Sequence, residues 1–142
     1  MINVLIKQAI PGLEMLLAEI RANVMRESLA SIGRYDEIRV RRRLLDTYNV
    51  SDTQIIYMDN ELIGFYVIED TCECYYLRHF YIIASKQGLG IGAFVMNTIK
   101  KRYCKKTIRL NALKNSKANQ FYLNNGFRHT GSEEFDNNYE FK

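Results

Sequence analysis

The sequence has few of the residues that mark specialised structural classes. Its 142 residues include one proline, no tryptophan, two histidines and three cysteines. Three cysteines are an odd number and cannot all pair in disulfide bonds within the chain, so we expect a reducing compartment and a cytoplasmic protein. No apolar run is long enough to span a bilayer, and no basic-then-apolar signal opens the chain. We therefore expect no membrane partner and no disulfide-stapled fold.

The composition that remains is typical of a globular protein. Hydrophobic residues make up 47% of the chain and charged residues 25%. The length predicts one domain over residues 1–142, large enough to bury its own core. The net charge of +4 favours an anionic ligand such as a nucleotide. We expect no nucleic-acid partner, because a dense basic stripe with stacking aromatics is missing.

A glycine-rich stretch at residues 85–93 is the centre of the sequence. An aromatic and β-branched run at 75–83 precedes it and a helix-like run at 94–102 follows it, so it reads as strand, loop and helix. Glycine lets backbone N–H groups turn toward one point and lets a ligand approach closely. The N-terminus of the next helix adds partial positive charge. This arrangement suits a phosphate group.

Hydrophobic periodicity and turn signals predict the element order β-α-α-β-β-β-α-β-α-β-β. The predicted strands cover residues 3–9, 53–58, 62–69, 75–83, 107–112, 127–131 and 138–141, and the predicted helices 13–25, 35–48, 90–103 and 117–125. The order predicts an α/β fold with a mixed, mostly antiparallel sheet of about seven strands and helices on both faces. The strands on either side of the glycine loop should form a parallel pair.

Three local signals refine this prediction. Gly64, inside a strand, indicates a bulge or a close backbone approach. Gly126 fits a left-handed cap at the end of the last helix. We also expect turns at 59–61 and 70–73, and an acidic turn at 133–138 before the last strand.

The glycine loop alone leaves two interpretations open. No Gly-Lys-Ser/Thr follows it, so it is not the lysine-containing phosphate loop, and its spacing differs from the dinucleotide fingerprint. It is then either a tight turn with close packing or a phosphate site.

A second motif decides between them. The loop sequence Gln87-Gly88-Leu89-Gly90-Ile91-Gly92 matches the pattern Gln/Arg-x-x-Gly-x-Gly/Ala. A later segment matches the pattern Asn-x-x-Ala-x-x-x-Tyr-x-x-x-Gly-Phe, whose fixed positions are filled by Asn115, Ala118, Tyr122, Gly126 and Phe127. With these motifs one helix and one strand apart, the chain resembles the GCN5-related N-acetyltransferase (GNAT) family from about residue 53 onward. The resemblance implies a single-domain GNAT-type fold and an acetyl-CoA-dependent N-acetyltransferase acting on an amine of a small molecule or a protein.

The resemblance also implies roles for individual residues. The residues implied to bind acetyl-CoA are Ile82, Ile83, Gln87, Gly88, Leu89, Gly90, Ile91, Gly92, Ala93, Asn115, Ala118 and Tyr122. The N–H near Ile82 would donate to the thioester carbonyl. Tyr122 would be the general acid for the leaving thiolate. Tyr122 could instead be one of the chain's ten tyrosines that only fill the core, and Asn115 a helix cap or turn residue.

The general base is less defined. Many members of the family use a glutamate on the central strand, and this chain has no acid between Tyr75 and Lys86. His79 is a catalytic candidate because an imidazole in water has a pKa of about 6.5; the alternative is a satisfied strand histidine. Glu69 and Glu73 could act through water, or the amine could arrive already neutral.

Several questions stay open. The arginines at 39 and 41–43 form an anionic-ligand patch, the frame of an acceptor site, or a solvated helix face paired with nearby acids. Cys72, Cys74 and His79 lack the four paired ligands of a structural zinc site, so we expect no metal. The amine acceptor is undefined, and exposed sheet edges allow a homodimer. The alternative function is an acyl-CoA-binding module without turnover.

Overall fold

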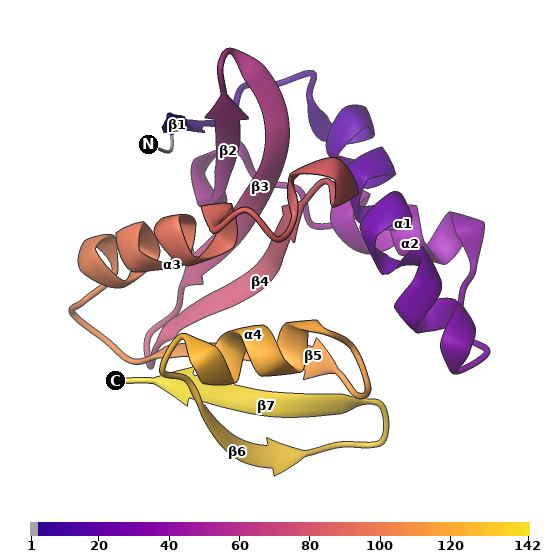
Figure 1. Cartoon of the computed structure of the whole chain (residues 1–142), viewed down its shortest axis with the longest axis vertical. Coiled ribbons are helices and arrows are strands. Elements are labelled where there is room, and N and C mark those ends of the chain that lie inside the picture. The colour runs from indigo at the N-terminus through magenta and orange to yellow at the C-terminus, as the bar shows by residue number, and fades with distance from the viewer. Residues whose placement is uncertain (1–2) are drawn as a thin grey trace. The chain divides into compact units, whose positions relative to one another are not determined.

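The structure, a computed structural model, describes residues 3–142 (Figure 1). Its helices and strands are β1 (Val4–Gln8), α1 (Glu14–Ser31), α2 (Glu37–Leu45), β2 (Thr53–Met58), β3 (Glu61–Asp70), β4 (Tyr75–Ile82), α3 (Ile91–Arg102), β5 (Ile108–Leu113), α4 (Ala118–Asn124), β6 (Arg128–Ser132) and β7 (Asp136–Phe141). Two short 3₁₀ turns, η1 (Val50–Asp52) and η2 (Ala84–Lys86), precede β2 and the glycine loop. The predicted element order is confirmed.

All seven strands form one sheet in the order β1-β2-β3-β4-β5-β7-β6. The pairs β1–β2, β2–β3, β5–β7 and β6–β7 are antiparallel. β4 and β5 are parallel, and their paired register consists of Tyr75 with Ile108 and Tyr76 with Arg109. The structure thus confirms the predicted α/β class, the mixed sheet and the parallel pair around the glycine loop.

The chain packs as two compact units. The first contains the residues up to 67 together with 79–91, and the second contains 68–78 together with 92–142. β3 and β4 each contribute residues to both units.

The first unit has its core between α1, α2 and the strands β2 to β4. Buried apolar side chains in this core include Leu17, Ala18, Leu44, Ile55, Phe65 and Tyr81. Burying such side chains provides the main driving force for folding, at about 25 cal/mol per Å² of apolar surface. α1 and α2 pack against each other (Figure 1).

The hairpin of β2 and β3 confirms two of the local signals. Its loop is Asp59-Asn60, with φ of 52° and 67°, as a two-residue turn with positive φ requires. At Gly64 a Cβ would overlap the carbonyl oxygen of Tyr81. The β2–β3 register also shifts between Ile56 and Tyr57, opposite this glycine. Gly64 therefore marks both a bulge and a close backbone approach.

In the second unit α4 packs against the strands β5 and β6, as Figure 1 shows. Gly126, with φ of 86°, ends α4. Its N–H donates to the carbonyl of Leu123, and the N–H of Phe127 donates to that of Tyr122. These are the two hydrogen bonds of a Schellman cap, so the left-handed cap predicted at Gly126 is confirmed.

Several predicted boundaries are wrong. α1 continues to Ser31 and does not end at 25, and α2 ends at Leu45 and not at 48. The acidic turn expected at 133–138 ends earlier, because β7 already begins at Asp136. Asn137 pairs with Ser132 and Asn138 with Gly131 across the β6–β7 ladder. Within β7 the Asn137 side-chain amide donates to Asn119 Oδ1 at 3.0 Å. A tertiary contact therefore offsets the low strand propensity of these residues.

Candidate active site

The glycine loop leads from β4 through η2 into the first turn of α3. Gly88 and Gly90 have φ of 77° and 83°, in the left-handed region that favours glycine. A Cβ on Gly88 would meet no atom within 4 Å, so the backbone conformation, and not lack of space, requires glycine there. Within residues 3–142, no hydrogen bond engages the N–H groups of Gly88, Leu89 or Gly90. Together with the first N–H groups of α3, they form a row of unsatisfied donors.

The residues just before this row are held by internal hydrogen bonds. The N–H of Gln87 donates to the Ala84 carbonyl at 3.2 Å, and its side-chain Nε2 donates to the Ile82 carbonyl at 2.7 Å. The N–H of Ile83 donates to the Ile63 carbonyl at 2.8 Å. Gln87 therefore closes the loop back onto the end of β4, and the donors available to a ligand lie from Gly88 onward.

Tyr122 lies on α4 and is buried, with 7% of its surface exposed. Its ring contacts those of Phe121, Phe127 and Tyr139, with centroid distances of 5.4, 5.5 and 6.1 Å. These edge and tilted contacts fix the ring and therefore the direction of its hydroxyl group.

The segment before Tyr122 is a turn rather than a helical cap. Asn115 is exposed and has φ of 67°, while α4 begins only at Ala118. The residue that caps α4 is Lys117, whose side chain makes no capping hydrogen bond. Asn115 is therefore a turn residue with a left-handed backbone, and Ala118 is half-buried in the first turn of α4.

The polar residue that organises this region is Asn119, for which the sequence analysis assigned no role. Its Nδ2 donates to the carbonyls of Leu113 and Ser116 at 2.9 and 3.0 Å. Its Oδ1 accepts from Tyr139 Oη at 2.7 Å and from Asn137 Nδ2 at 3.0 Å. One side chain thus joins α4 to the end of β5 and to β7, one helical turn before Tyr122. The sequence feature that could have pointed to this role is an amide side chain in a short helix, on the face that packs against the sheet.

In the first unit, His79 belongs to a partly buried polar chain. Its Nδ1 lies 3.0 Å from the hydroxyl of Tyr81, two residues along β4. The same hydroxyl lies 3.0 Å from Nε of Arg21, and Nη1 of Arg21 donates to the Val40 carbonyl at 2.6 Å. Arg21 is 7% exposed and Tyr81 9% exposed. α1, α2 and β4 are therefore connected by one buried guanidinium.

The donors and acceptors fix the direction of these bonds. A guanidinium only donates, so Tyr81 accepts from Arg21 and its own hydrogen is free to point at Nδ1 of His79. Burial raises the pKa of Tyr81 above its usual value, although the charges of Arg21 and Arg43 oppose that shift. Tyr81 therefore stays a protonated donor near neutral pH, and Nδ1 of a neutral His79 accepts.

The two glutamates weighed as alternative bases differ in their surroundings. Glu69 accepts a hydrogen bond from Arg78 Nε at 2.8 Å, which occupies its carboxylate. Glu73 is 84% exposed and lies 3.9 Å from Arg109 Nη1. Neither is buried as a tuned general base usually is.

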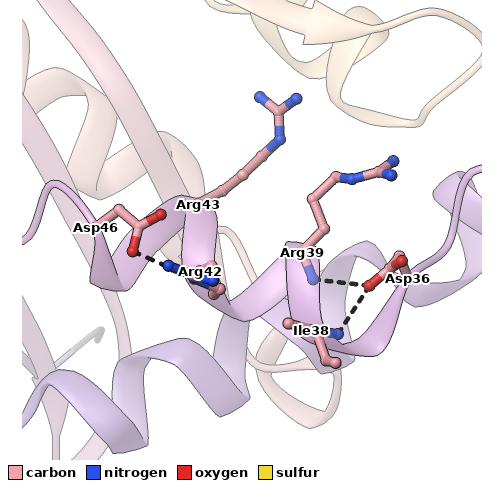
Figure 2. Close-up of a pocket in the computed structure, with 6 residues that line it drawn as sticks. All are labelled: Asp36, Ile38, Arg39, Arg42, Arg43 and Asp46. Atoms are coloured by element: carbon pink, nitrogen blue, oxygen red, sulfur yellow. Dashed lines mark hydrogen bonds and ion pairs between the residues drawn. The ribbon is translucent and has the colours of Figure 1, made fainter.

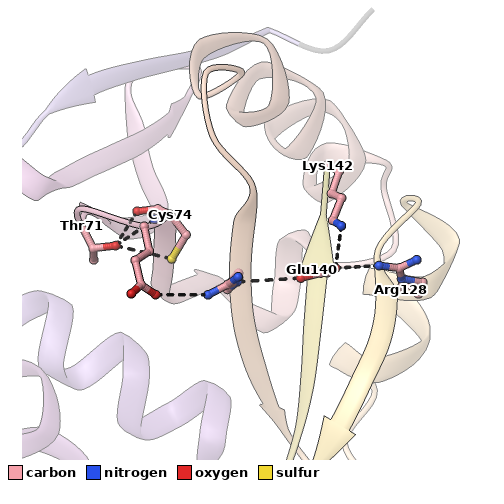
Figure 3. Close-up of polar contacts among 7 residues, drawn as sticks. Thr71, Cys74, Arg128, Glu140 and Lys142 are labelled. Carbon is pink, nitrogen blue, oxygen red and sulfur yellow. Dashed lines mark hydrogen bonds and ion pairs between the residues drawn. The ribbon is translucent and has the colours of Figure 1, made fainter.

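The three cysteines are free thiols. Cys74 is buried and Cys72 and Cys104 are exposed. As Figure 3 shows, Cys74 is part of the turn after β3, where its N–H donates to Thr71 Oγ1 at 3.0 Å. Over residues 3–142, no three His, Cys, Asp or Glu side chains are grouped to hold a metal ion. Nor does any helix in that range have the length and apolarity needed to cross a membrane.

Comparison with known proteins identifies the fold. The family model described as an acetyltransferase (GNAT) domain matches residues 34–142. No curated protein matches the chain by sequence.

Solved structures give the same result over nearly the whole chain. The PaiA N-acetyltransferase of Thermoplasma acidophilum, solved in complex with coenzyme A, is 18% identical, with 99% of each chain covered and a TM-score of 0.77. An acetyltransferase from Thermus thermophilus is 17% identical, with 98% of this chain and 96% of that chain covered and a TM-score of 0.77. An N-acetyltransferase from Staphylococcus aureus is 16% identical, with coverages of 96% and 100% and a TM-score of 0.73.

Proposed function

The chain belongs to the GNAT acetyltransferase family, and we propose that it transfers the acetyl group of acetyl-CoA to the nitrogen of an amine, carried by a small molecule or a protein. One observation carries this proposal. The loop before α3 has two left-handed glycines and a row of N–H groups without internal acceptors, next to a helix N-terminus. A diphosphate is the group that such a loop suits.

The donor site would use the backbone more than side chains. The N–H groups of Gly88 to Gly90 and the first turn of α3 would hold the diphosphate of coenzyme A, while Gln87 keeps the loop closed on Ile82. Gly88, Leu89 and Gly90 are exposed, so this part of the loop is open to a ligand. Acetyl-CoA, when bound, supplies an activated acetyl group.

Tyr122 is proposed as the general acid. In the reaction the amine nitrogen bonds to the acetyl carbon, the carbon–sulfur bond breaks, and the sulfur takes up a proton. The Tyr122 hydroxyl would give that proton and recover one from solvent. The aromatic contacts that fix its ring support this role, since a proton donor must be held in one orientation.

His79 is proposed to receive the proton that the amine loses. Its Nδ1 accepts a hydrogen bond from the Tyr81 hydroxyl group. A proton that reaches this nitrogen would therefore come through that hydroxyl group, or would replace its hydrogen bond. The occupied carboxylate of Glu69 and the exposed one of Glu73 make His79 the better candidate.

The test combines ligand binding with turnover. Acetyl-CoA at about a hundred times its Kd should stabilise the protein by about 2.7 kcal/mol, measured by thermal unfolding. Thiol release with a panel of amines should then detect turnover. Tyr122→Phe should lower kcat by about 100-fold and keep most of the acetyl-CoA stabilisation. The matched control is Tyr103→Phe, whose ring packs on Tyr75 with centroids 5.2 Å apart.

Each outcome has a clear meaning. No stabilisation by acetyl-CoA would refute the proposal. Stabilisation with no turnover on any amine would favour the second candidate, an acyl-CoA-binding module. The observation behind that candidate is the lack of a carboxylate on β4 between Tyr75 and Ile82.

A further inference from the structure

Helix α2 borders an open pocket of about 530 Å³. It is lined by Asp36, Ile38, Arg39, Arg42, Arg43 and Asp46, which Figure 2 shows. Three guanidinium groups and two carboxylates therefore face the same space. Which of these charges already have partners decides what the pocket can bind.

Both carboxylates are occupied. Asp36 caps α2, accepting hydrogen bonds from the N–H groups of Ile38 and Arg39 at 2.9 and 2.8 Å. The hydrogen bond from the Arg39 N–H is the main reason that the pKa of Asp36 lies below its usual value. Asp46 lies 3.5 Å from Nε of Arg42, one turn away on the same helix.

Two of the four arginines near this helix are also occupied. Arg42 pairs with Asp46, and Arg41 pairs with Glu19 of α1 and donates to the Glu37 carbonyl at 2.7 Å. These pairs match the local ion pairing considered for a solvated helix face. That interpretation explains only half of the cluster.

Arg39 and Arg43 are different. No hydrogen bond or ion pair to either guanidinium occurs within residues 3–142. They are four residues apart, so they lie on one face of the helix, and Figure 2 shows both side chains extending away from it on the same side. Two unpaired guanidinium groups one turn apart form a fork for an anion with several oxygens.

We propose that Arg39 and Arg43 bind a carboxylate or phosphate group of the acceptor, so that the substrate is a small molecule carrying both an amine and an anion. This inference rests on the proposed acetyltransferase function. Planar guanidinium groups bind such oxyanions with paired hydrogen bonds, which lysine does not match.

The position of α2 in the first unit supports this assignment. Arg21 connects the Val40 carbonyl, between Arg39 and Arg43 on α2, to the hydroxyl of Tyr81 on β4. Tyr81 in turn contacts His79. Arg43 is close enough for its charge to act on the Tyr81 phenol. The helix that carries the fork is thus connected by hydrogen bonds to the strand that carries the proposed base.

The experiment uses matched amines and matched variants. Thiol release would be compared for phosphoethanolamine against ethanolamine, and for glycine against glycinamide, on wild type, Arg39→Gln/Arg43→Gln and Arg42→Gln. The wild type should prefer at least one anionic amine. In the double variant the kcat/KM ratio of anionic to neutral amine should fall by about 10-fold or more, mainly through KM. Arg42→Gln should keep the wild-type preference, because Asp46 already neutralises Arg42.

Binding provides a second measurement that does not need turnover. Phosphoethanolamine or glycine should bind the acetyl-CoA-saturated wild type more tightly than the double variant, by titration calorimetry. If acetyl-CoA fails to stabilise the wild type, the proposed function fails. Two other results would overturn this inference alone, provided that acetyl-CoA stabilises the wild type. In the first, anionic and neutral amines bind and react equally. In the second, Arg42→Gln loses the preference for anionic amines as fully as the double variant. The two pairs of amines distinguish phosphate from carboxylate.

Discussion

Arg21 on α1 and Tyr81 on β4 are 60 residues apart in sequence and share a buried hydrogen bond, with Nε 3.0 Å from Oη. The guanidinium also lies 6.0 Å from the centroid of the Tyr81 ring. A buried cation is costly unless its donors are satisfied, and this one is satisfied by a phenol and a backbone carbonyl. The pair orients Tyr81 toward His79.

Replacing Arg21 should therefore destabilise the fold. In Arg21→Met the Tyr81 hydroxyl and the Val40 carbonyl lose a buried donor. We expect a loss of about 1–3 kcal/mol in the free energy of unfolding, measured by denaturant titration. Arg26→Gln, at an arginine of the same helix whose guanidinium lies 4.7 Å from the centroid of the Tyr35 ring, is the control and should lose less than about 1 kcal/mol. Equal losses in both variants would show that the buried hydrogen bonds contribute nothing specific.

His79→Ala should lower the rate most where the amine is protonated. If His79 removes the amine proton, kcat/KM at neutral pH should fall by about 100-fold. The defect should shrink as the pH rises toward the amine's own pKa, about 10.4 for a lysine-type amine, because the nucleophile then needs no base. The measurement is a pH profile of thiol release for both proteins.

The chain's other histidine provides the control for this prediction. His129 lies on β6 with its Nε2 3.0 Å from Ser132 Oγ, and His129→Ala should leave the profile unchanged. A defect in His79→Ala that stays constant across the pH range would argue for a structural role of His79 and against a base.

The fold was predictable because its signals are local. The Asp59-Asn60 turn, the bulge at Gly64 and the cap at Gly126 each arise from backbone conformations that few residue types adopt, so residue type reveals position. Hydrophobic periodicity located the helices and strands between them. At residues 133–138 this reasoning was wrong, because Asn137 gains a partner on α4 that no local pattern indicates.

The candidate site was predictable only in part, for the same reason. The motif residues Gly88 and Tyr122 are recognisable by spacing. Asn119 and Arg21 obtain their roles from partners 18 to 60 residues away. The sequence shows that an amide or a guanidinium group is present but does not indicate whether that group will be buried. Only the packed structure shows which polar groups form hydrogen bonds with it.

Asn119 should act as a positioning residue for Tyr122. Asn119→Ala removes two donations to carbonyls and two acceptances, one of them from Tyr139 Oη at 2.7 Å. We expect the free energy of unfolding to fall by about 1–3 kcal/mol and kcat to fall more than KM changes, since α4 loses its anchor. Unfolding and steady-state kinetics would be measured on the same protein.

A neighbouring asparagine separates positioning from simple loss of an amide. Asn124 is exposed at the end of α4 and accepts one hydrogen bond, from Gln120 at 2.7 Å. Asn124→Ala should change neither stability nor kcat appreciably. If Asn119→Ala loses stability but keeps the wild-type kcat below its unfolding temperature, its role is structural and the positioning role is excluded.

Glu140 on β7 should make stability depend on acid pH. Its side chain is 13% exposed and lies 2.6 Å from Arg128, 3.7 Å from Lys142 and 3.8 Å from Arg109, and Figure 3 shows it between Arg128 and Lys142. The hydrogen bond from Arg128, with the charges of Lys142 and Arg109, holds the pKa of Glu140 below its usual value.

The sign follows from that direction. A carboxylate with a lowered pKa in the folded protein contributes stability that is complete above its usual pKa and is lost as the pH falls through the lowered value. Glu140→Gln should therefore lower the unfolding temperature near neutral pH, and the gap to wild type should close as the pH falls below the usual pKa range of a glutamate carboxyl group. Glu134→Gln, at an exposed acid of the β6–β7 turn, should follow the wild-type curve throughout. A gap for Glu140→Gln that persists unchanged into acid would mean that lost packing, and not the ionised carboxylate, causes the destabilisation.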